Sequence, residues 1–312
     1  LIGGIVQLLF QIPFLIKIKK IPRLTRGNHP SVKTLKRRML PALFGVSVSQ
    51  INLLIDTMIA TALVSGSVSW LYYSDRLLEL PLALIGIALA TVALAKLSNY
   101  FANKDEQKFT RTINYALKIG LLLGAPACVG LVLLAEPLMI TLFQYDAFDA
   151  FAAHMSAMSL IAYGSGLMAF IMVKVLAPVF LSRGDTKTPV KAGVVAMVSN
   201  VFLNMIFAYY FDHIGLAIAT SISAVINASL LYYYLRKQSI YQFSSDLIKL
   251  FLKVLLASFI MVVFILNFSN DISFYLENGA WQRITSVAIT IIASAALYFA
   301  CLRLLGIRIK QL

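Results

Sequence analysis

Nine long apolar segments separated by short polar loops constrain the fold of this chain more than any other feature. A run of about 20 apolar residues is long enough to cross the hydrocarbon core of a bilayer as an α-helix. The composition agrees, because 60% of the 312 residues are hydrophobic and only 13% are charged. The sequence therefore predicts an all-α, polytopic membrane helix bundle, with segments at residues 1–18, 38–64, 67–95, 112–143, 153–181, 189–211, 214–235, 247–267 and 282–306.

The loops alternate in charge along the chain. Of the 27 Lys and Arg residues, 24 flank every second loop or the C-terminus, and the exceptions are Arg76, Lys174 and Arg283. Loops of membrane proteins that are rich in Lys and Arg stay in the cytoplasm. We therefore expect the basic loops and the C-terminus to be cytoplasmic. The net charge of +14 then reflects these loops, and we expect no nucleic-acid partner.

The apolar segment at 67–95 contains three charged residues, Asp75, Arg76 and Glu79. A charge at bilayer depth costs about 2.5–3.5 kcal/mol unless it faces protein or water. On a helix these residues share a face with Ser69, and leucines cover the opposite side. This pattern indicates a helix that lines a hydrated cavity. Arg76 is then either a binding group for a phosphate or carboxylate, or a structural partner of a nearby acid, for which Asp56 is a further candidate.

Lys174 is a second cation within a span. It lies nine residues before Arg183 at the end of its segment, which is roughly 13 Å along a helix. A side chain at that depth would strain to reach the interface. We expect it either to face the cavity as a second cationic contact or to pair with an acid on a neighbouring helix.

Asp56, Asn200, Asn204 and Thr220 are predicted to lie at a similar depth in three segments. A carboxylate, two amides and a hydroxyl offer the oxygen ligands that a hard cation such as Na⁺ prefers. The alternative is that the Asn and Thr side chains hydrogen-bond between helices, which is common in membranes. Both readings remain open from the sequence.

No pattern typical of an enzyme is present in the sequence. Cys128 and Cys301 lie in apolar segments, and the three His residues lack metal-ligand spacing. We find no nucleotide-binding or hydrolase motif. We therefore expect a non-enzymatic protein without a cofactor, for which Na⁺ or H⁺ as a coupling ion is the remaining option.

Two other features concern helix geometry and lipid contact. Pro81 lies two residues after Glu79 and should kink that helix, because the carbonyl of Leu77 loses its donor. The last two segments, 247–267 and 282–306, are almost entirely apolar. They are either plain lipid-facing helices or the walls of a groove for an acyl or isoprenyl tail.

Three stretches of the chain form a specific signature. They are SGSVSWLYYSDRLLELP at 65–81, GVSVSQ at 45–50, and VKVLAP at 173–178, which continues to SR at 182–183 and DTKTPVK at 185–191. Together they resemble the MurJ/MviN family of lipid II flippases, and the resemblance extends over essentially the whole chain. Two departures, Ala95 where the family has proline and Leu181 where it has an aromatic residue, affect only local helix geometry.

The resemblance implies a two-lobe exporter of the multidrug/oligosaccharidyl-lipid/polysaccharide exporter superfamily. This chain would hold the sixth to the fourteenth helix: residues 1–18 as the last helix of the first lobe, 19–37 as a cytoplasmic basic linker, 38–237 as the six-helix second lobe, and 238–312 as two extra helices that line the lipid-tail groove. The first lobe supplies further cavity arginines, so this part alone would hold half a site.

The implied activity is movement of lipid II, the lipid-linked peptidoglycan precursor, from the cytoplasmic to the periplasmic leaflet of the bacterial inner membrane without ATP. Arg76 would meet the diphosphate, with Asp75, Glu79, Ser69 and Lys174 around it. The expected partners are lipid II and membrane lipids, and we expect a monomer at full length. The rival functions are a cation-coupled multidrug antiporter, another polyprenyl-diphosphate-sugar flippase, and a membrane scaffold that transports nothing.

Overall fold

The computed structural model describes residues 2–18, 32 and 50–307 and divides the chain into two compact units, residues 1–40 and 41–312. The first unit contains α1 (Ile2–Lys17), an apolar helix with Pro13 inside it, which corresponds to the segment expected at 1–18. Apart from residue 32, the expected basic linker at 19–37 lies outside the described residues. So do residues 38–49, which include most of the family-like stretch at 45–50.

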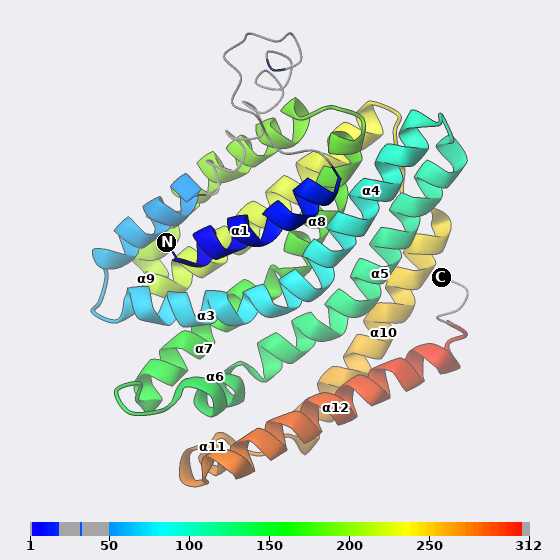
Figure 1. The fold of residues 1–312 in the computed structure, drawn as a ribbon. Helices are drawn as coiled ribbons and strands as arrows, with labels where there is room; N and C mark the ends of the chain where they lie inside the picture. Colours follow the sequence, from blue (N-terminus) through cyan, green and yellow to red (C-terminus); the bar gives the residue numbers. More distant parts are fainter. Residues whose placement is uncertain (1, 19–31, 33–49, 308–312) are drawn as a thin grey trace. The chain divides into compact units, whose positions relative to one another are not determined.

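The described part of the second unit contains helices and no strands (Figure 1). A helix over residues 50–61 is followed by α3 (Ser67–Pro81), η1 (Leu82–Ile87), α4 (Ala88–Ala102), α5 (Glu106–Leu133), α6 (Ala135–Phe143), α7 (Ala150–Ser165), α8 (Leu167–Ser182), α9 (Lys187–Lys237), α10 (Ser245–Phe268), α11 (Ile272–Glu277) and α12 (Ala280–Leu304). The side chains of Asp105, Asp149 and Ser244 accept hydrogen bonds from backbone N–H groups three residues later. These bonds cap the first turns of α5, α7 and α10.

Five of the described helices are long and apolar enough to cross a membrane: the continuous helix Ser67–Ala102, α5, α9, α10 and α12. The pair α7 and α8, bent by 44°, makes a sixth if it is one span. The expected all-α, multi-pass membrane bundle is therefore confirmed. The nine expected segments exceed this count because α9 contains two of them, and because α1 and the described helix at 50–61 are shorter than a span.

The 51-residue α9 consists of two antiparallel halves. Asp212 has φ 49° and ψ −133°, which interrupts the helix where the sequence predicts an outer turn. Across this turn, Asn200 Nδ2 donates to Thr220 Oγ1 at 3.2 Å and Ser223 Oγ donates to the Ala196 carbonyl at 2.9 Å. The two halves are therefore the segments expected at 189–211 and 214–235.

After Pro81, where the sequence predicts a kink, the structure has a π-helical segment, η1. Pro81 has no N–H group, so the carbonyl of Leu77 loses its usual helical partner. The N–H of Leu82 bonds to the carbonyls of Leu78 and Glu79. The chain then continues as a wider helix, and the span Ser67–Ala102 stays unbroken.

The segments expected at 112–143 and 153–181 each contain a break. Leu134 leaves helical geometry (φ −102°, ψ 18°) and separates α5 from α6. Gly166 separates α7 from α8, and a Cβ atom at this position would lie 2.6 Å from Ser221 Oγ. Glycine at the bend therefore lets α9 approach this point closely.

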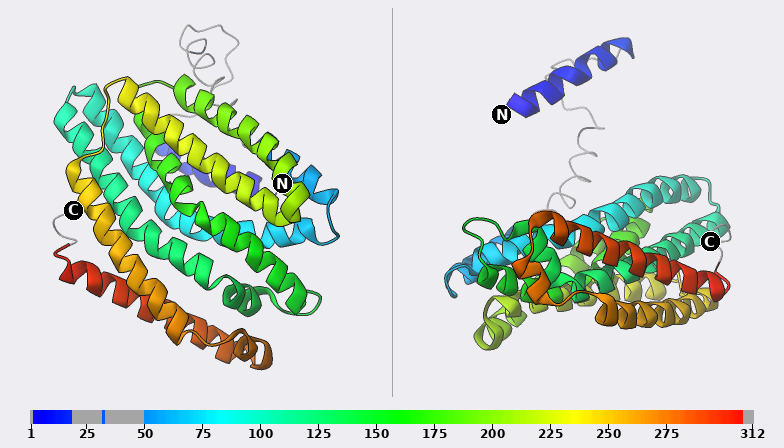
Figure 2. Two further views of the ribbon diagram at one scale, coloured as in Figure 1. Left: turned by 180° about the vertical axis from the view of Figure 1, so that it is seen from behind. Right: turned by 90° about the horizontal axis from the view of Figure 1, so that it is seen from below.

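The core of the second unit surrounds α8, which packs against α4, α5 and α9 (Figure 2). Its side chains Val175, Leu176, Val179 and Phe180 are 0–1% exposed. On α5, Gly120 and Gly124 lie four residues apart and face α8, and a Cβ atom at Gly124 would lie 2.8 Å from Ile171 Cδ1 and from Met168 Sδ. Small residues at this spacing allow two membrane helices to pack closely.

Gly215→Ala should destabilise the hairpin within α9. The added Cβ atom would lie 2.1 Å from the carbonyl oxygen of Phe207, a backbone atom that cannot rotate away. Overpacking of this kind costs about 1–3 kcal/mol, so we expect a lower midpoint of thermal unfolding for the purified protein. Gly193→Ala in the same helix is the control, because no neighbouring atom lies within 4 Å of the Cβ atom that it adds. Equal midpoints for the two variants would contradict the hairpin packing.

Candidate functional site

The polar face expected on the Arg76 helix is present on α3. Ser69, Arg76 and Glu79 are exposed, whereas Leu71 and Leu78 on the opposite side are buried. Arg76 and Glu79 thus face out of the second unit, and the leucines attach the helix to its core. This is the arrangement that the cost of charge in hydrocarbon predicts for a helix beside a hydrated cavity.

Arg76 is paired on one side only. Its Nη1 atom lies 2.7 Å from Glu79 Oε2, and its guanidinium carbon lies 4.9 Å from the centre of the Tyr72 ring. The side chains of Arg76 and Glu79 are 53% and 52% exposed, and exposed pairs of this kind contribute little to stability. Among the described residues, Glu79 is the sole acid in a salt bridge with Arg76. The remaining N–H groups of the guanidinium can therefore meet an incoming anion.

Asp75 is half-buried and does not neutralise its neighbour. It forms no hydrogen bond or salt bridge within the described part of the chain. Ser74 beside it is fully buried and donates to the Ser156 carbonyl at 2.6 Å, which anchors this side of α3 to α7. Of the three acids that the sequence offered as partners of Arg76, the structure brings only Glu79 into contact with it.

Lys174 lies on α8 and is exposed. Its aliphatic stem crosses the π-helical segment at Gly86, where a Cβ atom would lie 3.3 Å from Lys174 Cγ. Gly86 follows Arg76 by ten residues, which corresponds to roughly 15 Å along a helix. Lys174 therefore lies beside the Arg76 span but at a different depth from Arg76, and no described acid forms a salt bridge with Lys174.

The four residues of the expected oxygen cluster do come together. Asn204 Nδ2 donates to Asp56 Oδ1 at 2.6 Å and to Asn200 Oδ1 at 2.9 Å. Asn200 Nδ2 donates to Thr220 Oγ1 at 3.2 Å. Rotating the Asn200 amide by half a turn would instead place its nitrogen 3.1 Å from Asp56 Oδ1 and let its oxygen accept from Thr220. In either orientation the cluster links residues 50–61 to both halves of α9.

Sequence reasoning missed one member of this cluster. Asn52 Nδ2 donates to Asp56 Oδ2 at 3.3 Å. The spacing of four residues on one helix could have identified it, because such positions are neighbours on the helix surface. Asn204 is fully buried, and its Oδ1 atom has no hydrogen-bond partner among the described residues. Hydrogen bonds between helices hold the cluster together, and this oxygen is still free to accept.

The two C-terminal spans pack on each other. Val254, Ala257 and Met261 of α10 form a cluster with Tyr298 and Leu302 of α12. The groove expected along these two helices stays a prediction.

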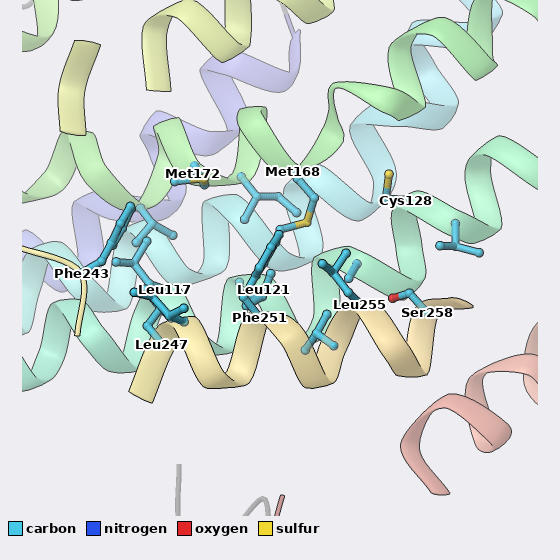
Figure 3. A pocket seen from close by; sticks show the side chains of 17 residues that line it. Leu117, Leu121, Cys128, Met168, Met172, Phe243, Leu247, Phe251, Leu255 and Ser258 are labelled. Carbon is cyan, nitrogen blue, oxygen red and sulfur yellow. The ribbon is translucent and has the colours of Figure 1, made fainter. Parts of the chain in front are cut away.

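An apolar groove of about 510 Å³ lies on another flank of α10, between α10, α5 and α8 (Figure 3). The sequence did not predict it, because its walls come from three segments far apart in the chain.

The comparisons with known proteins agree over nearly the whole chain. The family model for lipid II flippase MurJ matches residues 1–298. A probable lipid II flippase MurJ of Vibrio cholerae is 44% identical over 312 residues, which is 100% of this chain and 59% of the relative. The lipid II flippase MurJ of Burkholderia cenocepacia is 35% identical over 99% of this chain and 61% of the relative. The chain thus spans about three-fifths of the length of these relatives.

Two solved transporter structures share the fold of this chain. A lipid II flippase MurJ in an inward closed conformation is 28% identical and covers 91% of this chain and 58% of its own, with a TM-score of 0.71. An outward-facing multidrug resistance MATE family transporter is 20% identical over 90% of this chain and 67% of its own, with a TM-score of 0.59, and shows the fold alone. The series of apolar helices in this chain makes it a multi-pass membrane protein. The chain belongs to the lipid II flippase MurJ family.

Proposed function

We propose that the protein containing this chain moves lipid II from the cytoplasmic to the periplasmic leaflet by alternating access, without ATP. One observation carries the proposal: a half-exposed guanidinium on the polar face of a membrane-spanning helix, in a chain of the lipid II flippase family. Lipid II carries a diphosphate, which an arginine fork binds with two parallel hydrogen bonds. Because this chain covers about three-fifths of its relatives, the activity belongs to the whole protein.

Arg76 and Lys174 suggest two successive positions for the diphosphate. Lys174 contacts the Arg76 span at Gly86, in the π-helical segment. This position is nearer than Arg76 to the end of the bundle that carries the basic loops. A headgroup that enters from that end meets Lys174 first and Arg76 afterwards. Glu79 would release Arg76 as the diphosphate arrives, since a carboxylate and a phosphate compete for the same N–H groups.

We also propose an inner-membrane protein with a cytoplasmic C-terminus. The loops between α4 and α5, α8 and α9, and α9 and α10 gather at one end of the second unit, and these are the basic loops (Figure 1). The positive-inside rule supports their cytoplasmic placement. The division into a second lobe at 38–237 and two extra helices at 238–312, and a monomeric full-length protein, are part of the same proposal.

The rival transport functions differ in what the cavity should contain. A cation-coupled multidrug antiporter should present acids to a cationic drug, whereas two exposed cations, Arg76 and Lys174, are present here and the exposed acid Glu79 is paired with Arg76. Another polyprenyl-diphosphate-sugar flippase would use the same anion contacts. Competition between lipid II and another lipid-linked sugar for transport would distinguish that function from lipid II translocation. A scaffold without transport would not need the exposed arginine.

Arg76→Ala should abolish lipid II translocation by the full-length protein in proteoliposomes while leaving membrane insertion intact. Arg76→Lys should retain part of the activity, because it keeps the charge and loses the fork. Arg236→Ala at the end of α9 is the control and should transport normally. Normal lipid II translocation by Arg76→Ala would refute the anion site.

Glu79→Gln tests whether Arg76 serves the substrate or a structural pair. Removing the carboxylate frees the Arg76 guanidinium, so lipid II should bind more tightly, by about 2- to 5-fold, the equivalent of a weak exposed ion pair. Native mass spectrometry of the full-length protein with lipid II measures this. If Arg76 were only structural, Glu79→Gln would leave lipid II binding unchanged.

We further propose that Na⁺ couples transport at the cluster of Asp56, Asn200, Asn204 and Thr220. The buried, unpartnered Asn204 Oδ1 and the Asp56 carboxylate supply oxygen ligands of the kind that hard cations prefer. H⁺ taken up by Asp56 is the alternative.

Replacing Na⁺ by choline at constant ionic strength should slow lipid II transport, and Asp56→Asn should remove this dependence. Asp271→Asn, an exposed acid before α11, is the control and should keep the wild-type response. A wild-type rate that does not change without Na⁺ would eliminate Na⁺ coupling. A rate that follows pH instead, and loses that response in Asp56→Asn, would assign the site to H⁺.

A further inference from the structure

We propose that the groove between α5, α8 and α10 binds one acyl chain of an anionic phospholipid, with its headgroup toward the basic end of the bundle. This groove-binding lipid is separate from the transported substrate. The proposal does not depend on the transport function, because no residue of the groove belongs to the Arg76 stripe or the Asp56 cluster.

The groove follows from unequal packing of two helices on α5. Gly120 and Gly124 let α8 approach the α5 backbone closely, as described above. On its other side, α5 packs against Leu250 and Val254 of α10. Between them α8 and α10 remain apart, and the space over α5 has a volume of about 510 Å³ (Figure 3).

The shape and chemistry of this space fit a single hydrocarbon chain. A water molecule occupies about 30 Å³, and a methylene group is of similar size, so the groove holds roughly 17 such groups. This is the length of a common acyl chain and far less than a polyprenyl tail. Its walls include Met168 and Met172, whose flexible side chains adapt to an irregular ligand. Ser258 supplies a hydroxyl that has no partner among the described residues.

The end of the groove at Phe243 is the basic end. Phe243 lines the groove there and stacks on Tyr232 with ring centres 3.9 Å apart. Lys118 lies seven residues before the groove residue Ala125, so both lie on one face of α5. Helical side chains tilt toward the start of the helix, which directs the Lys118 side chain toward this end.

The charges near this end favour an anion. Lys118 forms no salt bridge with any described residue, and the exposed Lys249 lies one turn into α10. Lys253 donates to the Leu305 carbonyl at 2.7 Å and is occupied. The nearby acid, Asp246, is exposed in the first turn of α10 and forms no salt bridge among the described residues. Basic residues at a membrane surface attract anionic lipids in this way.

Photolabelling of the full-length protein tests the proposal. The probe is phosphatidylglycerol with a photoreactive group midway along one acyl chain, as a minor component of phosphatidylcholine nanodiscs. We expect the label on groove residues of α5, α8 or α10. Ala125→Phe fills the groove and should lower this labelling about tenfold, the factor expected when about two methylenes can no longer be buried. Leu252→Phe, on the exposed face of α10 outside the groove, should label as the wild type does.

Two further variants make the outcome independent of a folding defect in Ala125→Phe. Ser258→Leu removes an unpartnered hydroxyl and narrows the groove, so it should fold normally and also lose labelling. Lys118→Gln should lower labelling by the phosphatidylglycerol probe but not by a phosphatidylcholine probe with the same chain. Labelling that persists in both groove-filling variants would overturn the lipid site. Equal labelling by the two probes in the wild type would overturn its anionic headgroup.

Discussion

The cost of placing charge in hydrocarbon is the constraint from which the arrangement of this bundle follows. A charged side chain in a span must face water, protein or an ion of opposite charge, because no polar medium surrounds it otherwise. Arg76 meets this requirement by lying on an exposed polar face with Glu79, opposite the leucines that hold α3 in the core. Asp56 meets it differently, through amide hydrogen bonds from Asn52 and Asn204. These solutions leave Arg76 open to a ligand and enclose Asp56.

Close approach of helix backbones is the second requirement, and glycine at a few positions provides it. Gly166, at the bend between α7 and α8, lets Ser221 of α9 approach closely, and Gly86 leaves room for the stem of Lys174. Gly124 brings α8 onto α5 and so creates one wall of the apolar groove. Small residues in membrane helices thus determine where helices meet and where space remains between them.

Much of this could be predicted from the sequence, because hydropathy and charge act along the chain. The polar face of α3 and the association of Asp56, Asn200, Asn204 and Thr220 both follow from spacing and depth. The pairing of Arg76 with Glu79 rather than with the adjacent Asp75 is also local, because residues three apart are neighbours on a helix surface. Other features depend on contacts across the fold. The breaks at Leu134 and Gly166, and the groove over α5, arise from packing between segments that are distant in sequence.

The π-helical segment after Pro81 gives its span an additional degree of freedom. A π-turn closes its hydrogen bonds over five residues instead of four, so it stores one residue more than an α-turn. Conversion of η1 to ordinary α-helix would rotate α4 by about 100° relative to α3. The polar face around Arg76 would keep its orientation while the half of the span below it presented a different surface. One half of a single helix can in this way rotate about the helix axis relative to the other half, without unfolding of either end.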